Sequence, residues 1–488
     1  MGAQVSGRSV RVSGSSMRVP GSTPRVSGSS VRVRGSSVPG PGGGETARLL
    51  AGMLGDPLAG YLRLAARYGE VVRVPFAPRR YWFVLSRPEH AEHVLAANQD
   101  NYVKAFTYRP LRALVGNGLL TSEGEPWRRH RRLIQPVFSR REVTGLGPQM
   151  TAPARRLAAR WSGLAEGSPV DLAREMSALT LEIVGLALFG ANLTDDAGQL
   201  GRAMAVGQRV AVLTTFLPIG WGPVSTRAVK SFARRLGGAG EGIEGVAGRL
   251  IAARRAGGEP ARASGDLLDV LLAARDEDGG PLTDGEICDE VATFLLAGHE
   301  TSANTLAWSL ALLSAYPAAR ERLEAELDAV LGDRDPGADD VARLPWARAV
   351  VSEALRLYPP AWTIERDALA DDDVAGTPVP AGSMVAISPY LVHRHPGFWP
   401  DPAGFDPRRF LPGGSGDATT RHRYAFIPFG GGRRACVGAS FAELETVLVL
   451  ATIARRFRLE LTARGMPAPV AQVTLRPGRN LPMLLRHR

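Results

Sequence analysis

The chain is poor in cysteine, with only 2 among its 488 residues. That number is too small for a disulfide framework, and no Cys-x-x-Cys pair is present for a zinc site. We therefore expect a reducing, intracellular compartment. No stretch approaches the roughly 18 uninterrupted apolar residues of a transmembrane anchor, and the N-terminus lacks the apolar core of a secretory signal. Hydrophobic residues make up 44% of the chain and charged residues 22%, which is typical of a globular protein.

Acidic residues and lysine are absent from residues 1–44, although the formal net charge of the whole chain is +11. This stretch carries six of the arginines in a degenerate seven-residue repeat such as VRVSGSS. Its glycines and prolines disfavour a helix, and its apolar surface is too small to offset the entropy of ordering. We expect a disordered tail over 1–44 and a single domain over 45–488. Attachment to an anionic surface or use as a transit peptide is an alternative role for the tail.

Good helix formers dominate from about residue 125 onward, which predicts a mainly α fold with small β-sheets. An apolar segment with Pro and Gly, residues 214–223, is either a loop over a pocket or a buried turn. The remaining pattern predicts helices over 45–68 and 439–456, and strands over 71–74, 81–85, 384–387 and 473–475.

One long helix is delimited by its own end signals. Thr283 and Glu286 form a capping box at its start, and Pro317 stops it after Tyr316. At 1.5 Å per residue the helix spans about 50 Å. Its middle, VATFLLAG at 291–298, is apolar around most of its circumference, so we expect this helix to cross the core.

The most informative segment is PFGGGRRACVG at 428–438, where Cys436 lies between glycines just before a helix. Nearby cations, here Arg433 and Arg434, and the partial positive charge of a helix N-terminus both favour a thiolate. Glycines allow a tight turn and a close approach to a flat partner. A buried cysteine in a Gly-rich turn is the structural alternative. Cys288, in a helical stretch, is interpreted as a small core residue.

The spacing of this segment resembles the haem-thiolate signature of cytochromes P450. The resemblance implies that Cys436 is the proximal iron ligand and that Phe429 packs against its sulfur. It also implies that Gly432 and Gly438 belong to the haem-binding loop, and that Arg434 pairs with a haem propionate. The implied fold is that of a cytochrome P450, in which the long central helix crosses the core over a buried haem.

A second motif lies halfway along the long helix, at Ala297-Gly298-His299-Glu300-Thr301. The Thr301 hydroxyl can compete for the Ala297 carbonyl four residues earlier and open the helix locally. The segment resembles the family's oxygen-activation motif. This likeness implies that Gly298 leaves room for a diatomic ligand beside Ala297, while Glu300 and Thr301 relay protons.

A third motif is Glu353-Ala354-Leu355-Arg356, whose two charged residues share a helix face and can pair. It resembles the family's ExxR motif, and Arg409, within the segment FDPRRF, resembles the third partner. The resemblance implies a structural network behind the haem, with no part in catalysis.

A fourth motif places Trp127 and Arg131 four residues apart on one helix face. It resembles the W-x-x-x-R helix, which implies that both residues reach a haem propionate. Arg366 resembles a further propionate partner, because a guanidinium suits an anionic carboxylate. His393 is a weaker candidate for the same role.

The resemblance implies a monooxygenase with haem b (heme b, iron protoporphyrin IX) as cofactor and O2 as cosubstrate. No Rossmann GxGxxG is present in a strand–helix context, so a ferredoxin and an NAD(P)H-dependent ferredoxin reductase are expected as transient electron donors. A basic cluster is a candidate docking surface for the ferredoxin, with a solvated basic face as the alternative: Arg128, Arg129, Arg132, Arg140 and Arg141. We expect a monomeric bacterial cytoplasmic protein without nucleic-acid partners.

The implied substrate pocket is mainly apolar, which favours a terpenoid, fatty acid, steroid or polyketide from secondary metabolism. Its candidate residues are Phe106, Phe216, Phe294, Leu296, Trp362, Ile364 and Thr474. Two alternatives remain open, a non-catalytic haem-thiolate sensor and a peroxide-driven peroxygenase. The presence of Glu300 and Thr301 favours the electron-driven route.

Overall fold

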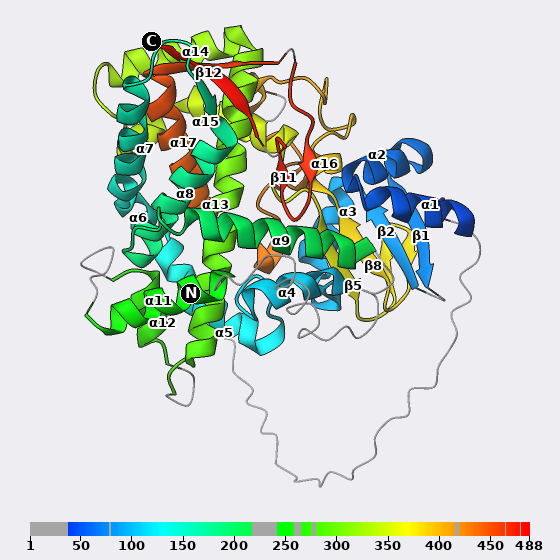
Figure 1. Ribbon diagram of the computed structural model, residues 1–488. Helices are drawn as coiled ribbons and strands as arrows, with labels where there is room; N and C mark the ends of the chain where they lie inside the picture. Colours follow the sequence, from blue (N-terminus) through cyan, green and yellow to red (C-terminus); the bar gives the residue numbers. More distant parts are fainter. Residues whose placement is uncertain are drawn as a thin grey trace, which may run out of the picture. The chain divides into compact units, whose positions relative to one another are not determined.

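The computed structural model (Figure 1) describes residues 38–488 except 78–79, 217–241, 258–264, 276–279, 415–418, 464 and 479. Residues 1–37 of the predicted tail and most of the apolar segment 214–223 lie outside the described residues. Residues 38–44, also assigned to the tail, contact the folded domain. The Pro39 carbonyl accepts a hydrogen bond from the Arg73 amide at 2.9 Å, and Val38 packs beside a buried apolar cluster. The described chain therefore begins before the predicted domain boundary.

Helices make up most of the described chain, as the composition predicts. The first eight are α1 (Gly43–Met53), α2 (Pro57–Tyr68), α3 (Pro88–Glu92), α4 (Arg109–Val115), α5 (Gly124–Ile134), α6 (Arg140–Gly145), α7 (Gly147–Ser162) and α8 (Leu172–Phe189). The others are α9 (Ala197–Phe216), α11 (Gly242–Arg255), α12 (Leu267–Ala273), α13 (Asp284–Ala315), α14 (Pro317–Leu331), α15 (Pro345–Leu357), α16 (Pro389–Val392) and α17 (Ala439–Ala454).

The strands form small sheets. The largest has the order β1-β2-β8-β5-β3, in which only β2 and β8 pair in parallel. A three-stranded sheet has the order β4-β12-β9, and β6-β7 and β10-β11 form separate pairs. The strands are β1 (Val71–Ala77), β2 (Arg80–Leu85), β3 (Tyr102–Lys104), β4 (Pro169–Asp171), β5 (Ile364–Ala368), β6 (Asp372–Val374), β7 (Thr377–Val379), β8 (Met384–Ile387), β9 (Phe457–Leu461), β10 (Val470–Ala471), β11 (Leu475–Arg476) and β12 (Pro482–His487).

Several predicted boundaries differ from the structure. The helix predicted over 45–68 is two helices, α1 and α2, because Asp56 caps the second by accepting from the Ala59 amide at 3.0 Å. The strands predicted over 71–74 and 81–85 are parts of β1 and β2, and the one predicted over 384–387 is β8. Only Leu475 of the strand predicted over 473–475 is in β11.

The long helix is α13, and its predicted capping box is present. The Thr283 hydroxyl accepts from the Glu286 amide at 3.2 Å, while the Glu286 carboxylate accepts from the Thr283 amide at 2.9 Å. The helix ends at Ala315 and Tyr316 caps it, as expected next to Pro317. None of the described helices has the length and apolar character needed to cross a membrane.

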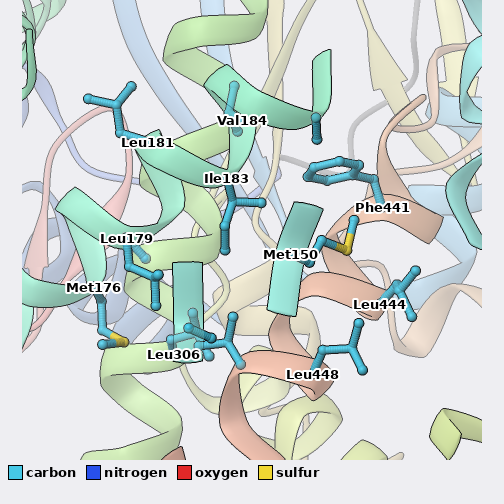
Figure 2. Close-up of a cluster of buried hydrophobic side chains, with 14 of the residues drawn as sticks. Met150, Met176, Leu179, Leu181, Ile183, Val184, Leu306, Phe441, Leu444 and Leu448 are labelled. Carbon is cyan, nitrogen blue, oxygen red and sulfur yellow. The ribbon is translucent and has the colours of Figure 1, made fainter. Parts of the chain in front are cut away.

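Figure 2 shows the core around α13, where apolar side chains of α7, α8, α13 and α17 meet. Leu306 of α13 and Leu448 of α17 are both fully buried. Burying a leucine side chain stabilises a fold by about 1.5–3 kcal/mol, so this shared core fixes α13 against α17. Because α17 begins at Ala439, three residues after Cys436, the packing also fixes the cysteine loop relative to the middle of α13.

Candidate active site

A cavity of about 320 Å³ lies between the middle of α13 and the cysteine loop. Its wall is mostly apolar and is built by α5, α13, β5, the loop at 428–438 and the start of α17. The structure brings together on this wall the following residues that the sequence singled out: Trp127, Arg131, Phe294, Ala297, Gly298, Thr301, Ile364, Arg366, Phe429, Arg434, Cys436 and Gly438.

Cys436 presents its sulfur to this cavity. Its amide donates to the Phe429 carbonyl at 2.9 Å, which closes the loop into a tight turn. The side chain is accessible from the cavity, yet protein atoms crowd it, and this burial raises the pKa of the thiol. The Gly438 amide and the Arg131 guanidinium act in the opposite direction and lower the pKa of Cys436.

The cation that acts on the sulfur is Arg131 of α5, and neither Arg433 nor Arg434 contributes to the pKa of Cys436 as expected. The pairing of Arg434 with a haem propionate stays a prediction. Arg433 pairs with Asp100 at the surface. Arg434 pairs with Glu123 and donates to the Ser122 carbonyl at 3.0 Å. Each arginine is thus paired with an acid far away in the sequence, which the spacing alone does not reveal.

The glycines of the loop meet two different needs. Gly430 and Gly432 have φ of +72° and +64°, which favour glycine. A Cβ at Gly432 would also lie 1.7 Å from the Leu95 carbonyl oxygen. The backbone of residue 95 therefore explains the glycine at 432, and the place of Gly432 in a haem-binding loop stays a prediction.

Four basic residues line the cavity, Arg366, Arg131, Lys104 and Arg434. Arg366 is buried, and its guanidinium donates to the Glu365 carbonyl at 2.9 Å. No carboxylate of the described residues lies within ion-pair distance of Arg366 or Arg131. Buried cations are normally paired, so this edge of the cavity fits a ligand with anionic substituents.

Lys104 was missed by the sequence reasoning. Its ammonium group donates to the Leu119 carbonyl at 3.3 Å and also to the Leu120 and Ser122 carbonyls. Burial and the nearby charges of Arg434 and Arg366 place the pKa of Lys104 well below its usual value. Its isolated occurrence in a lysine-poor sequence was the only available signal.

The opposite side of the cavity is the middle of α13. The Thr301 hydroxyl donates to the Ala297 carbonyl at 2.8 Å. Gly298 lies on the wall, and a Cβ there would come within 3.0 Å of Val184 of α8. A glycine at this position therefore serves the packing of α8 as well as the space in the cavity.

Glu300 is directed toward the C-terminal strands. Its carboxylate accepts from the Thr474 hydroxyl at 2.8 Å and pairs with Arg476 of β11 at 3.2 Å. The Thr474 hydroxyl also accepts from the Asn304 amide at 3.3 Å. Thr474, a predicted pocket residue, thus lies between two polar side chains of α13.

The predicted substrate residues are distributed over several environments. Phe294 stacks on Phe138 with ring centroids 5.3 Å apart, and both line the cavity with Ile364. Others lie in apolar clusters or elsewhere: Leu296 in the main core, Phe106 beside Phe76, and Trp362 with its indole donating to the Gln472 carbonyl at 2.9 Å. The side chain of Phe216, at the end of α9, lies outside the described residues.

The three residues of the predicted network meet in a buried cluster. Arg356 binds Glu353 through two hydrogen bonds of 2.7 Å, and both side chains are fully buried. Arg409 reaches the same carboxylate at 3.3 Å. Arg356 also donates to the carbonyls of His393 and Pro402, at 3.0 and 2.7 Å. The network holds the segment before the cysteine loop against α15.

His393 belongs to this structural region and not to the cavity wall. Its Nε2 accepts from the Ile427 amide at 2.8 Å, so the ring is neutral at that nitrogen. Burial, followed by the charge of Arg356, places the pKa of His393 well below its usual value. This residue orders the loop that leads to Cys436.

A comparison with protein families matches residues 50–481 to the model described as Cytochrome P450. The chain belongs to the cytochrome P450 family. This P450 is similar over most of its length to bacterial relatives. It is 36% identical to cytochrome P450 132 of Mycobacterium bovis over 89% of this chain and 93% of the relative. It is 35% identical to cyclooctat-9-en-7-ol 5-monooxygenase of Streptomyces melanosporofaciens over 82% of this chain and 84% of the relative. It is 34% identical to pentalenene oxygenase of Streptomyces avermitilis over 89% of this chain and 94% of the relative.

The family and the named oxygenases identify the protein as a cytochrome P450 monooxygenase. P450s use haem, and the cavity fits that group, because a cysteine sulfur faces it from one side and cationic side chains lie at its edge. Haem held by a thiolate supplies the chemistry of O2 activation when bound. In this cavity Cys436 would be the ligand of that group, Arg131, Arg366 and Lys104 would face its anionic substituents, and the Thr301 hydroxyl would lie on the α13 side.

Proposed function

We propose that this P450 oxygenates an apolar small molecule of the terpenoid class and takes its electrons from a separate ferredoxin and an NAD(P)H-dependent reductase. The observation that carries the proposal is the apolar wall that Phe294, Phe138 and Ile364 form in the cavity that Thr301 and Cys436 also line. Apolar walls with few polar groups favour an apolar ligand. Two relatives bear names of terpenoid oxygenases, cyclooctat-9-en-7-ol 5-monooxygenase and pentalenene oxygenase, which supports the same class.

The test is a spectral titration of the purified haem-loaded protein with pentalenene, cyclooctat-9-en-7-ol and dodecanoic acid. We expect the two terpenoids to shift the iron spin state at lower concentration than the fatty acid. Conversion of the bound terpenoid, dependent on NAD(P)H and a surrogate ferredoxin system, completes the test. A shift by dodecanoic acid alone would contradict the terpenoid class, and binding without conversion would favour a haem-thiolate sensor. Equal conversion with hydrogen peroxide alone would favour a peroxygenase.

The proposed ferredoxin would need a docking surface on this protein, and we expect that surface to be cationic. Arg132 of α5 is exposed and pairs at 3.2 Å with the exposed Glu125, and Arg140 and Arg141 are exposed at the start of α6. Arg129 is less available, because it pairs with Glu286 of α13. Charges at the rim of an interface act mainly on the association rate and its salt dependence.

Arg132→Glu tests this surface. We expect it to raise the ferredoxin concentration needed for half-maximal turnover and to flatten the salt dependence of the rate. Arg63→Glu, an exposed arginine of α2 beside the five-stranded sheet, is the matched control and should change neither. Equal effects of the two substitutions would remove the docking proposal.

A further inference from the structure

Helix α5 supplies side chains of the cavity wall, yet few of its own side chains are buried in the core. Of its 11 residues, only His130 and Ile134 are buried. Four of the others are arginines, and like charges on one short helix repel one another. The position of α5 in the fold therefore depends strongly on its contacts with acidic groups of other elements.

One of these contacts lies in the interior of the protein. The Nδ1 atom of His130 is 2.6 Å from the Oε1 atom of Glu290 of α13, and the two side chains are 3% and 0% exposed. Neither side chain has a hydrogen-bond partner among the described residues, so the contact is one of charge and not of hydrogen-bond direction. A charge that is alone in the interior is costly, so His130 and Glu290 stabilise each other there.

A second contact joins the same two helices closer to the surface. Glu286 lies one turn before Glu290 on α13 and pairs with Arg129 of α5. The Arg129 and Glu286 side chains are 26% and 34% exposed, and the Glu286 carboxylate is 3.9 Å from the Nε2 atom of His130. Solvent and salt weaken an ion pair that is in contact with water. The buried contact of His130 is therefore the more effective link between α5 and α13.

The residue that follows His130 is Arg131, whose guanidinium reaches from α5 to the cysteine loop. Its Nη1 atom donates to the carbonyl of Ala435 at 2.8 Å, directly before Cys436, and its Nε atom donates to the Gln135 side chain at 3.0 Å. Arg131 is also the cation that acts on the Cys436 sulfur. A displacement of α5 would lengthen the contact with the loop and weaken this action, because Coulomb energy falls with distance.

We propose that the contact between His130 and Glu290 positions Arg131 at the Cys436 sulfur. The proposal rests on haem bound at Cys436, but it requires neither the terpenoid substrate nor the ferredoxin. His130 and Glu290 are not among the described residues that line the cavity, so both are positioning residues. When their contact is lost, α5 is free to move from α13 and the positive charge near the sulfur decreases. Reduction of the bound iron then becomes less favourable, because reduction adds an electron.

The primary test is the reduction potential of the iron in the haem-loaded full chain, measured by spectroscopic titration with a chemical reductant. We expect His130→Asn and Arg131→Gln each to shift the potential to a more negative value. The variant with both substitutions should shift no further than Arg131→Gln, because residues that act as one unit are not additive. No shift with His130→Asn, or additive shifts in the double variant, would overturn the proposal.

Arg254→Gln is the matched control for the loss of a buried ion pair. Arg254 of α11 is 8% exposed and pairs with the fully buried Asp266 at 2.7 Å. Neither residue is on the described wall of the cavity. We expect this substitution to lower stability and to leave the potential of the iron unchanged. A shift as large as that with His130→Asn would show that the potential follows stability alone, and it would overturn the positioning role.

A variant with both His130→Phe and Glu290→Leu separates positioning from stability. Apolar residues that replace a buried ion pair often leave stability unchanged or raise it, so this variant should fold even where His130→Asn does not. We expect a wild-type midpoint of urea unfolding together with the negative shift of the potential. A wild-type potential would show that the contact only fills space and would overturn the proposal. The thiolate-type spectrum of the reduced CO complex is checked first, and its absence from the wild type would overturn the ligand assignment on which the proposal rests.

Discussion

Replacing Glu353 by alanine removes the central anion of the buried network. Two hydrogen bonds of 2.7 Å to Arg356, one of 3.3 Å to Arg409 and one of 2.9 Å from the Asp406 amide are lost together. Arg356 is then left as a fully buried cation with only carbonyl partners. Removing one member of a buried ion pair costs about 3–5 kcal/mol, against a total stability of about 5–15 kcal/mol for a typical domain. We therefore expect Glu353→Ala to lose much of its stability and its haem.

The assay is urea unfolding followed by tryptophan fluorescence, with haem content measured on the same samples. Arg408→Ala is the matched control. Arg408 is adjacent to Arg409, but its side chain, which pairs with Asp406, is 72% exposed. An exposed ion pair contributes about 0–1 kcal/mol to stability, so the free energy of unfolding of the control should stay near that of the wild type. If the free energies of unfolding of Glu353→Ala and the Arg408→Ala control differ by no more than about 1 kcal/mol, the network is not a major stabilising element.

Three further outcomes are expected. Thr301→Ala should keep haem but raise the peroxide released per NAD(P)H, since it removes the hydroxyl by which α13 lines the cavity; an unchanged ratio would contradict its relay role. Arg476→Gln should change the same ratio in the opposite direction, because it releases the Glu300 carboxylate from β11; a change of the same sign as with Thr301→Ala would contradict this reasoning. Burial raises the pKa of Asp367 from 3.8 to about 6, so between these pH values the folded state keeps a proton that the unfolded state has lost, and stability should fall as pH rises through this range. The measurement is the free energy of unfolding in urea at pH 4 and at pH 7. In Asp367→Asn the loss of this free energy between the two pH values should be smaller than in the wild type, by at most about 3 kcal/mol. An equal loss in both proteins would exclude this group.

Local signals were sufficient where the chemistry is encoded over a few neighbouring residues. The capping box of Thr283 and Glu286 marks the start of α13, because both partners lie within one helical turn. The glycines around Cys436 mark a tight turn before α17 for a similar reason. The spacing of Glu353 and Arg356 places the two side chains on one face of α15.

Contacts between residues far apart in the chain decided which charged groups lie near Cys436, Glu300 and the cavity wall. The sequence neighbours of Cys436 suggested Arg433 and Arg434 as its cations, but folding brings Arg131 from α5 to the sulfur and sends both neighbours to acids. Whether Glu300 faces the cavity or β11 depends on Arg476 at the other end of the chain. Lys104 became a wall residue only through the packing of its segment.

The sequence by itself determined that Cys436 lies in a glycine turn and that Thr301 lies in a long apolar helix, because turn geometry and helix periodicity are local properties. Only the tertiary structure decided which charges act on which groups. Burial and Coulomb interactions depend on distances between residues far apart in the chain, and spacing along the sequence does not contain those distances. The contact of His130 with Glu290 illustrates this most clearly, since it exists only after α5 and α13 have packed.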